Sequence, residues 1–432
     1  MESSAIKIFM VLLVVVAVAM TVFKPGGSAP ANADAVVITL SFWGSYEEWG
    51  MWREIVDLFH KDNPDVWVKI NYIPDGYEDK IRLLLAADGA PDVMLIQDEP
   101  FPAYAGYGKF ADLTDWAYGP DAPVDWDTAF WPTAAESFKY KGRVMGLPIW
   151  GGNVLVYYNR RMFRDMGVEP PSDDWNLDEF VAKAKELTRD LDGDGAVDTF
   201  GLTLPGWVYF LPWTWAFDAD YLDESRTDWA FTGPEALAAT AFYQDLRFRY
   251  HVAPSIQEIP SATEGAMFMT GRIGMTVSGP WNSPGLKTAG IDFDVVHIPY
   301  GPTGKRSTRV TWDALCLFDK CKNKEAAWRF MKHCVTPEAQ AVVGKYIRSV
   351  PALIEAKDSF MDPDNGWSEE KYIDALAYAR LQPISKQWQA MSNVMLPEYE
   401  QLLLNKITPE QCIENMAENM RREGVFPIED RE

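Results

Sequence analysis

The feature that most constrains the fold is an alternation of short apolar runs with an amphipathic segment near the start of the chain. Residues 36–44, VVITLSFWG, form one apolar run, and residues 63–74, NPDVWVKINYIP, return to an alternating pattern. Between them Trp52, Ile55 and Phe59 recur at the spacing of a helix. A strand, a helix and a second strand in this order predict a βαβ unit and an α/β fold class.

The next segment extends this pattern to a parallel sheet. A helical stripe carries Ile81 and Leu85, and residues 90–96, APDVMLI, form a short strand that is apolar throughout. Ligands of open α/β sheets bind in the crevice at the carboxyl ends of the strands. Residues 43–45 and 97–99, which follow two of the predicted strands, are therefore candidates for a binding site.

The chain is long enough for a second domain. Its 432 residues exceed the usual size of one domain. Asn176 with Glu179, and Thr408 with Gln411, have the spacing of capping boxes, which begin helices. Residues 293–318 predict two strands joined by a loop rich in Gly, Pro and Lys, which can carry the chain back to the first domain.

The charge of the chain excludes some classes of partner. Its 40 Lys and Arg residues stand against 63 Asp and Glu residues, which gives a formal net charge of −23. Such a chain repels phosphate backbones and anionic lipids, so nucleic acid is not an expected partner. The 18 tryptophans are an unusually high number, and residues 205–217, PGWVYFLPWTWAF, are especially rich in aromatic side chains.

Residues 1–33 predict an export signal. An apolar run from Ile8 to Phe23 follows a short polar start, and Ala31 and Ala33 precede Asp34 in the pattern of a cleavage site. The run is slightly short for a membrane span, so cleavage and retention as an N-terminal anchor are both open. No cysteine lies nearby to carry a lipid of the usual bacterial kind. We expect the mature chain to work outside the cytoplasm, in a periplasm or at the cell surface.

The cysteines do not form a metal motif. All four lie in the last third of the chain, at Cys316, Cys321, Cys334 and Cys412. An oxidising compartment permits a disulfide, and four thiols allow three pairings. Buried free thiols and one structural disulfide are both compatible with the sequence.

The order of several motifs resembles the carbohydrate-binding family of extracellular solute-binding proteins of ABC importers, which includes maltose-binding protein. The motifs span most of the chain and include ITLSFWGS, FHKDNPDVWVKINYIPDGYEDKI, LLAADGAPDVMLIQ, GKFADLTDW, KGRVMGLPI, VYYNRRMFRDMGVEPPSDDWNLDEFVAKAKELT and MTGRIGMTVSGPW. The resemblance implies a two-lobe periplasmic-binding-protein fold of type II, with hinged lobes and a ligand cleft between them. It implies a first α/β lobe of residues 36–147 plus 310–360 and a second of residues 150–305 plus 365–432.

The resemblance also implies which residues face the cleft. They are Trp43, Ser45, Asp98, Glu99, Trp150, Asn153, Trp207, Tyr209, Trp281, Trp312, Asp313 and Trp388. Flat aromatic side chains stack on the C–H faces of a sugar ring, and carboxylates accept hydrogen bonds from its hydroxyl groups. Within the aromatic stretch, Trp213 and Trp215 are expected in the core instead. This chain has Gly152 about where maltose-binding protein has a carboxylate, which argues against maltose as the ligand.

These observations predict a monomeric receptor that captures a sugar or an oligosaccharide and delivers it to an ABC permease in the membrane. The chain has no motif of a serine hydrolase, a zinc protease or a P-loop enzyme, so it is not predicted to be an enzyme. A secreted glycosidase is the alternative of another class, with Asp98 and Asp313 as its two carboxylates. A non-sugar solute such as a glycerophosphodiester is a further alternative, for which Arg348 is the late arginine to consider.

One acidic segment resembles part of a calcium-binding loop. The positions that supply oxygen ligands in such loops are occupied here by Asp190, Asp192, Asp194, Ala196 and Asp198. The twelfth position is Gly201 where a bidentate glutamate is usual. A structural calcium ion and an acidic turn without a metal are therefore both open, and no other cofactor is expected.

Overall fold

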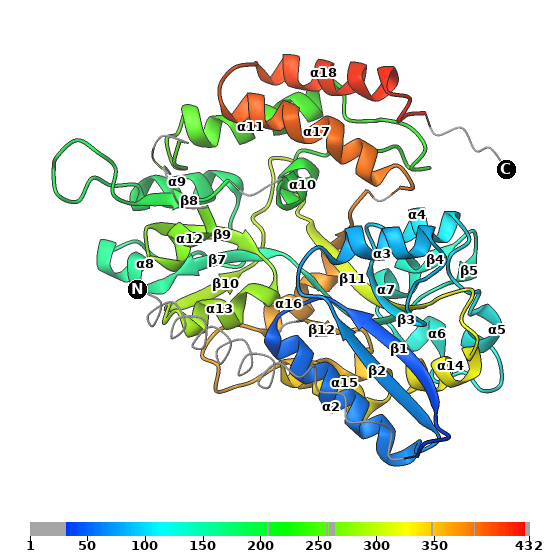
Figure 1. Ribbon diagram of the computed structural model, residues 1–432. Helices are drawn as coiled ribbons and strands as arrows, with labels where there is room; N and C mark the ends of the chain where they lie inside the picture. The colour runs from blue at the N-terminus through cyan, green and yellow to red at the C-terminus, as the bar shows by residue number, and fades with distance from the viewer. Residues whose placement is uncertain are drawn as a thin grey trace, which may run out of the picture.

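The computed structural model describes residues 32–204, 207–255, 258, 264–346, 349–383 and 385–427, and the side chains of residues 207–209 and 264–265 fall outside this description. The described chain is a mixed α/β structure built on two main sheets (Figure 1). Residues 1–31 of the predicted export signal lie outside the described residues. None of the helices in the described ranges is long and apolar enough to cross a membrane.

The first sheet has seven strands. Their order is β12 (Val350–Pro351), β6 (Leu147–Asn153), β11 (Thr308–Leu317), β3 (Val93–Gln97), β1 (Val36–Phe42) and β2 (Val66–Tyr72), and β13 (Ala379–Leu381) pairs with β11. β1 is parallel to both β2 and β3, which confirms the predicted βαβ unit. β11 is antiparallel to β3 and to β6, so the sheet is mixed and not purely parallel.

The first helix of this sheet, α2 (Tyr46–Asp62), begins with a capping box at Ser45. The Ser45 side chain accepts from the Glu48 backbone, the Glu48 side chain accepts from the Ser45 backbone, and this reciprocal pair starts the helix directly after β1. The stripe of Trp52, Ile55 and Phe59 is buried in the first core, as its spacing predicts. The other helices packed around this sheet are α3 (Tyr77–Ala86), α4 (Phe101–Gly106), α5 (Thr114–Ala117), α6 (Trp126–Ala129), α7 (Pro132–Ser137), α14 (Lys324–His333) and α15 (Pro337–Lys345), with a small hairpin of β4 (Lys139–Tyr140) and β5 (Arg143–Val144).

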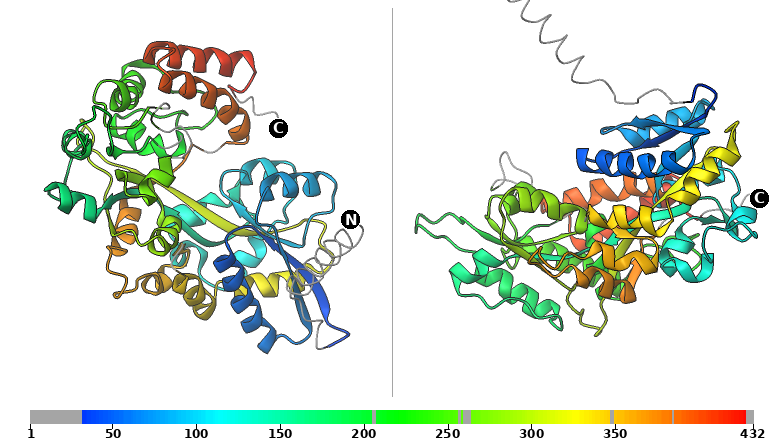
Figure 2. Two further views of the ribbon diagram at one scale, coloured as in Figure 1. Left: turned by 60° about the vertical axis from the view of Figure 1, so that its left-hand side comes forward. Right: turned by 90° about the horizontal axis from the view of Figure 1, so that it is seen from below.

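The second sheet has four strands, in the order β10 (Phe293–Val296), β7 (Leu155–Asn159), β9 (Ile273–Ser278) and β8 (Phe200–Leu202). β6 of the first sheet leads almost directly into β7 of the second. The chain returns from β10 to β11, which confirms that the two strands within residues 293–318 carry it back. Figure 2 shows the two sheets with their helices as two lobes, with the long strand β11 running between them.

The helices of the second lobe come from the middle and the end of the chain. They are α8 (Arg160–Met166), α9 (Leu177–Leu187), α10 (Trp207–Ala216), α11 (Gly233–Phe248), α12 (Glu264–Met269), η2 (Pro280–Asn282), α13 (Ser283–Thr288), α17 (Trp388–Leu403) and α18 (Pro409–Arg422). The predicted capping boxes at Asn176 and Thr408 are both formed. α17 and α18 pack on α11 in the same core, so the last helices complete the second lobe (Figure 1).

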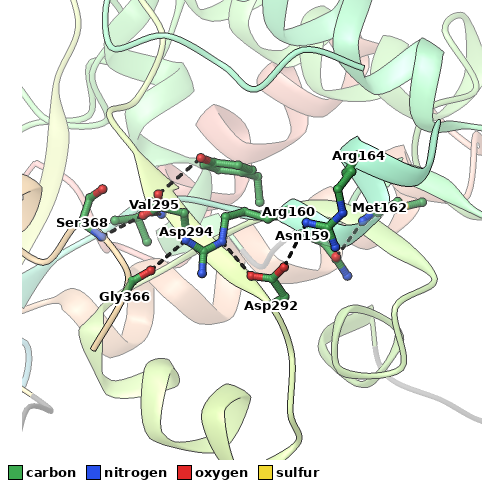
Figure 3. A network of polar contacts seen from close by, with 10 residues as sticks. Asn159, Arg160, Met162, Arg164, Asp292, Asp294, Val295, Gly366 and Ser368 are labelled. Atoms are coloured by element: carbon green, nitrogen blue, oxygen red, sulfur yellow. Dashed lines mark hydrogen bonds and ion pairs between the residues drawn. The ribbon is translucent and has the colours of Figure 1, made fainter. Parts of the chain in front are cut away.

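The connection from β12 back to β13 packs against the second sheet. It contains η3 (Ile354–Phe360), α16 (Glu370–Ala375) and η4 (Leu376–Tyr378), and Val350 and Phe360 share a core with Leu155 and Phe293. Figure 3 shows how polar contacts reinforce this packing, since Arg160 donates both to Asp292 Oδ1 and to the Gly366 carbonyl at 2.7 Å. Residues near 350–375 pack in the core of the first sheet and in the core that they share with the second sheet. The predicted limits of the two lobes therefore stay a prediction.

The aromatic stretch forms the helix α10, although its sequence shows no helical period. The side chains of Trp213 and Trp215 are 2% and 3% exposed, which confirms the prediction that they belong to the core. A helix that is apolar on every side gives no stripe, and Pro212 lies inside this one. The side chains of Trp207 and Tyr209 lie outside the described residues, so their predicted place in a cleft is untested.

Candidate functional site

The register of three neighbouring strands brings four of the predicted site residues together. Asp98 and Glu99 follow the carboxyl end of β3, and Asp313 of β11 lies opposite Gln97 of β3. Trp150 of β6 lies opposite Asp313 on the other side of β11. The site is therefore built at the edge where β1 and β3 end and where β6 and β11 leave for the second sheet.

Asp98 is fully buried and is held by hydrogen bonds from β11. Thr311 Oγ1 donates to its Oδ1 at 2.8 Å, and the Trp312 backbone N–H donates to its Oδ2 at 3.3 Å. Burial and the neighbouring Glu99 raise the pKa of Asp98 from 3.8 to about 7. Asp98 thus positions β11 against β3, and its side chain is 0% exposed, which leaves no surface for a ligand in this structure.

Glu99 forms an ion pair that the sequence did not predict. Arg309 Nη2 lies 2.8 Å from Glu99 Oε1, and the side chains of these residues are 6% and 19% exposed. Gln382, just after β13, donates from Nε2 to the same Oε1 at 2.7 Å, and its own carbonyl accepts from Arg309 Nε at 2.8 Å. A signal for Arg309 was present, because Arg309, Thr311 and Asp313 alternate along β11 and so share one face.

Asp313 and Trp150 form a second pair beside the first. Trp150 Nε1 donates to Asp313 Oδ2 at 2.7 Å, while Asp313 Oδ1 is enclosed and has no hydrogen-bond partner among the described residues. Burial and the charge of Asp98 raise the pKa of Asp313 well above its usual value. The raised pKa values shift Asp98 and Asp313 toward their protonated forms.

Trp43 lies on the other side of the loop that follows β3. Its ring is half-buried, with its centroid 5.0 Å from that of Tyr77. Trp43, Gln97 and Pro100 line one small cavity, and neither Asp98 nor Glu99 is among its lining residues. Ser45, by contrast, uses its hydroxyl group to cap α2, which gives it a structural role.

Trp150 is 3% exposed and lies in the first core, and two further predicted cleft residues also lie in the interior, so the assignment of all three is corrected here. Trp312 is 0% exposed, and its indole N–H donates to Thr133 Oγ1 at 3.0 Å. Trp312 lies on the face of β11 opposite to that of Asp313, and the face with Trp312 packs into the first core. Asn153 is also 0% exposed and donates to the Tyr372 carbonyl at 2.8 Å. Neither side chain presents an atom to a ligand in this conformation.

Trp281 brings the second lobe to the site. It lies in η2, directly after β9, and is half-buried. A Cβ atom on Gly152 would lie 3.0 Å from Pro280 Cγ and 3.2 Å from Trp281 Cζ3, so the missing side chain of Gly152 permits this approach. Gly152 and Trp150 share a face of β6, because they are two residues apart. Trp388 begins α17 and packs half-buried against the second core.

The acidic loop forms a compact turn apart from this site. Oxygen atoms of Asp190, Asp192 and Asp194 lie within 4.8 Å of one another, and all three residues are exposed. The Gly193 and Gly195 backbones donate to Asp190, which lowers the pKa of that carboxyl group. Asp198 accepts from the Leu191 backbone at 2.7 Å. The three clustered oxygens suit a calcium ion, and calcium binding stays a prediction.

All four cysteines are free thiols in this structure, and all four are buried. Burial raises the pKa of Cys316 and Cys334 well above the usual value, which disfavours the reactive thiolate. Of the two alternatives left open by the sequence, the structure has the free thiols.

Two α/β lobes joined by crossing strands, with aromatic and carboxyl side chains where those strands cross, define a two-lobe binding protein of type II. The chain belongs to the bacterial extracellular solute-binding protein family, whose model matches residues 54–371. Family membership confirms the resemblance seen in the sequence. The similar proteins are named as binding proteins, and the family name describes its members as extracellular.

Several relatives and solved structures are similar over most of the chain. A binding protein of Brucella abortus is 23% identical over 90% of this chain and 93% of its own length. A maltotriose-binding protein of Pyrococcus abyssi is 26% identical over 68% of this chain and 61% of its own. The structure of an ABC substrate-binding protein from Listeria monocytogenes in complex with cycloalternan is 26% identical, with a TM-score of 0.82 over 91% of this chain and 100% of that one. These matches confirm the two-lobe fold.

Proposed function

We propose that this protein is the carbohydrate receptor of an ABC importer, and that it captures a sugar or an oligosaccharide for a membrane permease. The observation that carries the proposal is the pair of half-buried carboxyl groups of Glu99 and Asp313 at the strand crossing, with half-buried Trp281 of the second lobe beside Gly152. Relatives named for maltotriose and maltooligosaccharide binding support the same ligand class.

The chemistry of the cluster suits a polyhydroxylated ring. A carboxylate oxygen accepts hydrogen bonds from two adjacent hydroxyl groups, and an indole face covers the C–H surface of the ring. Burying a polar group without a partner costs about 1–3 kcal/mol, so a ligand that satisfies these groups stabilises a closed arrangement of the lobes.

The cluster is less suited to the alternative ligand of the sequence analysis. A phosphate group needs free cationic donors, whereas Arg309 is already paired with Glu99. Arg348 lies outside the described residues. We therefore keep the sugar as the proposed ligand.

The receptor is proposed to be non-catalytic. A glycosidase needs two accessible carboxyl groups on either side of the bond that it cleaves. Asp98 is fully buried, and Asp313 is tied to Trp150. Incubation with aryl glycosides and oligosaccharides should give no cleavage product, and release of the aryl alcohol at a rate that saturates with substrate would contradict this.

We further propose that the protein acts as a monomer outside the cytoplasm, with its N-terminal segment either cut after Ala33 or kept as an anchor. Mass spectrometry of the protein from its host membrane and soluble fractions distinguishes the two forms. A chain beginning at Asp34 indicates cleavage, and an intact start in the membrane fraction indicates an anchor.

A thermal-shift screen tests the proposed ligand class. A ligand that binds only the native state raises the free energy of unfolding by RT ln(1 + [L]/Kd). We expect at least one linear or cyclic oligosaccharide of a broad panel to raise the melting temperature in a concentration-dependent way. Glycerophosphodiesters in the same screen should leave it unchanged, and the opposite pattern would replace the sugar by a phosphate ligand.

A further inference from the structure

Around Glu99, three separate segments of the chain meet in one polar network. Glu99 follows β3, Arg309 lies on β11, and Gln382 follows β13. β11 and the segment after β13 both lead from one lobe to the other. The network therefore lies on segments that connect the two lobes, and a movement of one lobe relative to the other would change its geometry.

The two oxygen atoms of Glu99 have different surroundings. Oε1 accepts from Arg309 Nη2 at 2.8 Å and from Gln382 Nε2 at 2.7 Å. No hydrogen bond from the described residues reaches Oε2. The side chain of Glu99 is 19% exposed, whereas that of Arg309 is 6% exposed and Gln382 is fully buried. One oxygen is thus fixed from behind, and the other is the accessible acceptor.

The amide of Gln382 is fully used by this network. Its carbonyl oxygen accepts from Arg309 Nε at 2.8 Å, and its nitrogen donates to Glu99 Oε1 and, at 3.3 Å, to Asp98 Oδ1. The amide therefore separates two neighbouring carboxyl groups and orients the arginine. A methionine of similar length would fill the space but could do neither.

We propose that Arg309 and Gln382 are positioning residues for ligand binding, which hold Glu99 with its Oε2 atom directed to a hydroxyl group of the ligand. This proposal rests on the proposed sugar-binding function and deepens it. A carboxylate held in one rotamer loses less conformational entropy on binding than a mobile one.

A double-mutant cycle tests whether the two residues act through Glu99. Affinity for the best oligosaccharide of the panel is measured by calorimetry for the wild type, Gln382→Met, Glu99→Ala and the double variant. We expect Gln382→Met to weaken binding about tenfold in the wild-type background and less than about twofold in the Glu99→Ala background. Gln401→Met, at the far end of α17, is the matched control and should bind as the wild type does.

A second cycle with Arg309→Lys keeps the charge and removes the paired donors. Arg309→Lys should weaken ligand binding in the wild-type background and have little effect on it in the Glu99→Ala background. This cycle replaces the first one if circular dichroism shows that Gln382→Met does not fold. Equal factors in both backgrounds would overturn the positioning role and leave the receptor function intact. A wild-type protein that binds no oligosaccharide of the panel would overturn both proposals.

Discussion

At the scale of single residues, the site combines the half-buried carboxyl groups of Glu99 and Asp313 with the fully buried Asp98. Asp98 connects β3 to β11 through Thr311 and the Trp312 backbone. Asp98 has two opposite effects on the free energy of unfolding. Its hydrogen bonds stabilise the strand crossing, whereas its buried charge destabilises the folded protein. The pH dependence of stability separates these two effects.

Asp98→Asn should flatten part of the dependence of stability on pH. The carboxyl group has a pKa of about 7 in the folded protein and a usual value of 3.8, so folding takes up a proton between these values. Stability is therefore highest below about pH 4 for this group and falls as the pH rises to about 7, by roughly 2–4 kcal/mol.

Urea unfolding at a series of pH values checks this prediction. The wild type should lose more stability than Asp98→Asn between pH 5 and pH 7. Asp57→Asn, at an exposed position on α2, is the control and should follow the wild type. Parallel curves for the wild type and Asp98→Asn would mean that Asp98 is ionised throughout this range.

Two tryptophans should respond to substitution in opposite ways. Trp312→Ala removes a fully buried side chain and should cost about 3–5 kcal/mol of stability. Trp281→Ala removes a half-buried ring and should weaken ligand binding at least about tenfold with a smaller loss of stability. Measuring the melting temperature and the affinity of both variants decides this, and a large affinity loss in a well-folded Trp312→Ala would restore Trp312 to the site.

Part of the site could be predicted at this scale and part could not. Trp43, Asp98 and Glu99 follow from the rule that ligands bind where parallel strands end. Arg309 and Gln382 lie more than two hundred positions further along the chain, and only the register of β11 and β13 brings them to Glu99. Trp312 was placed in the cleft by resemblance, whereas the alternation along its own strand points it inward.

At the scale of elements, local signals predicted the beginnings of helices well. Ser45, Asn176 and Thr408 each begin a helix with a reciprocal capping contact. Two of these pairs were predicted from residue spacing alone. α10 was not predicted as a helix, because a helix that is apolar on all sides has no polar face to mark its period. The core that Val350 and Phe360 share with Leu155 and Phe293 was also not predicted, because it joins segments from both halves of the chain.

The acidic loop supplies a prediction about metal binding. If Asp190, Asp192 and Asp194 bind calcium, 1–5 mM calcium chloride, on the order of the weaker loop affinities, should raise the melting temperature. Asp192→Asn with Asp194→Asn should abolish the rise, and magnesium chloride should not replace calcium. Identical melting curves in calcium and in a chelator would assign the loop as an acidic turn without a metal.

At the scale of the whole molecule, β6, β11 and the segment around β13 connect the two lobes, and residues within 350–375 pack against both. This arrangement permits a hinge, and a ligand that contacts both lobes favours their closed state. Small-angle scattering should therefore show a smaller radius of gyration when a saturating oligosaccharide is present. An unchanged scattering curve at proven saturation would mean that the ligand binds to one lobe alone.

The division into two α/β lobes could be predicted because each lobe follows familiar alternations of strand and helix. Their relation could not be derived from periodicity, since it depends on which distant segments share a sheet. β13, for example, pairs with β11 of the first sheet, although the resemblance assigned its range to the second lobe. Such pairings are decided by long-range packing and leave no local pattern.

The most direct test of the account is a calorimetric titration of the protein from Asp34 onward with a panel of linear and cyclic oligosaccharides. The account predicts saturable binding of at least one of them, at about one ligand per chain, with a loss of affinity of about tenfold or more in Glu99→Ala. Absence of heat change with every member of the panel, or binding that Glu99→Ala leaves unaltered, would contradict it.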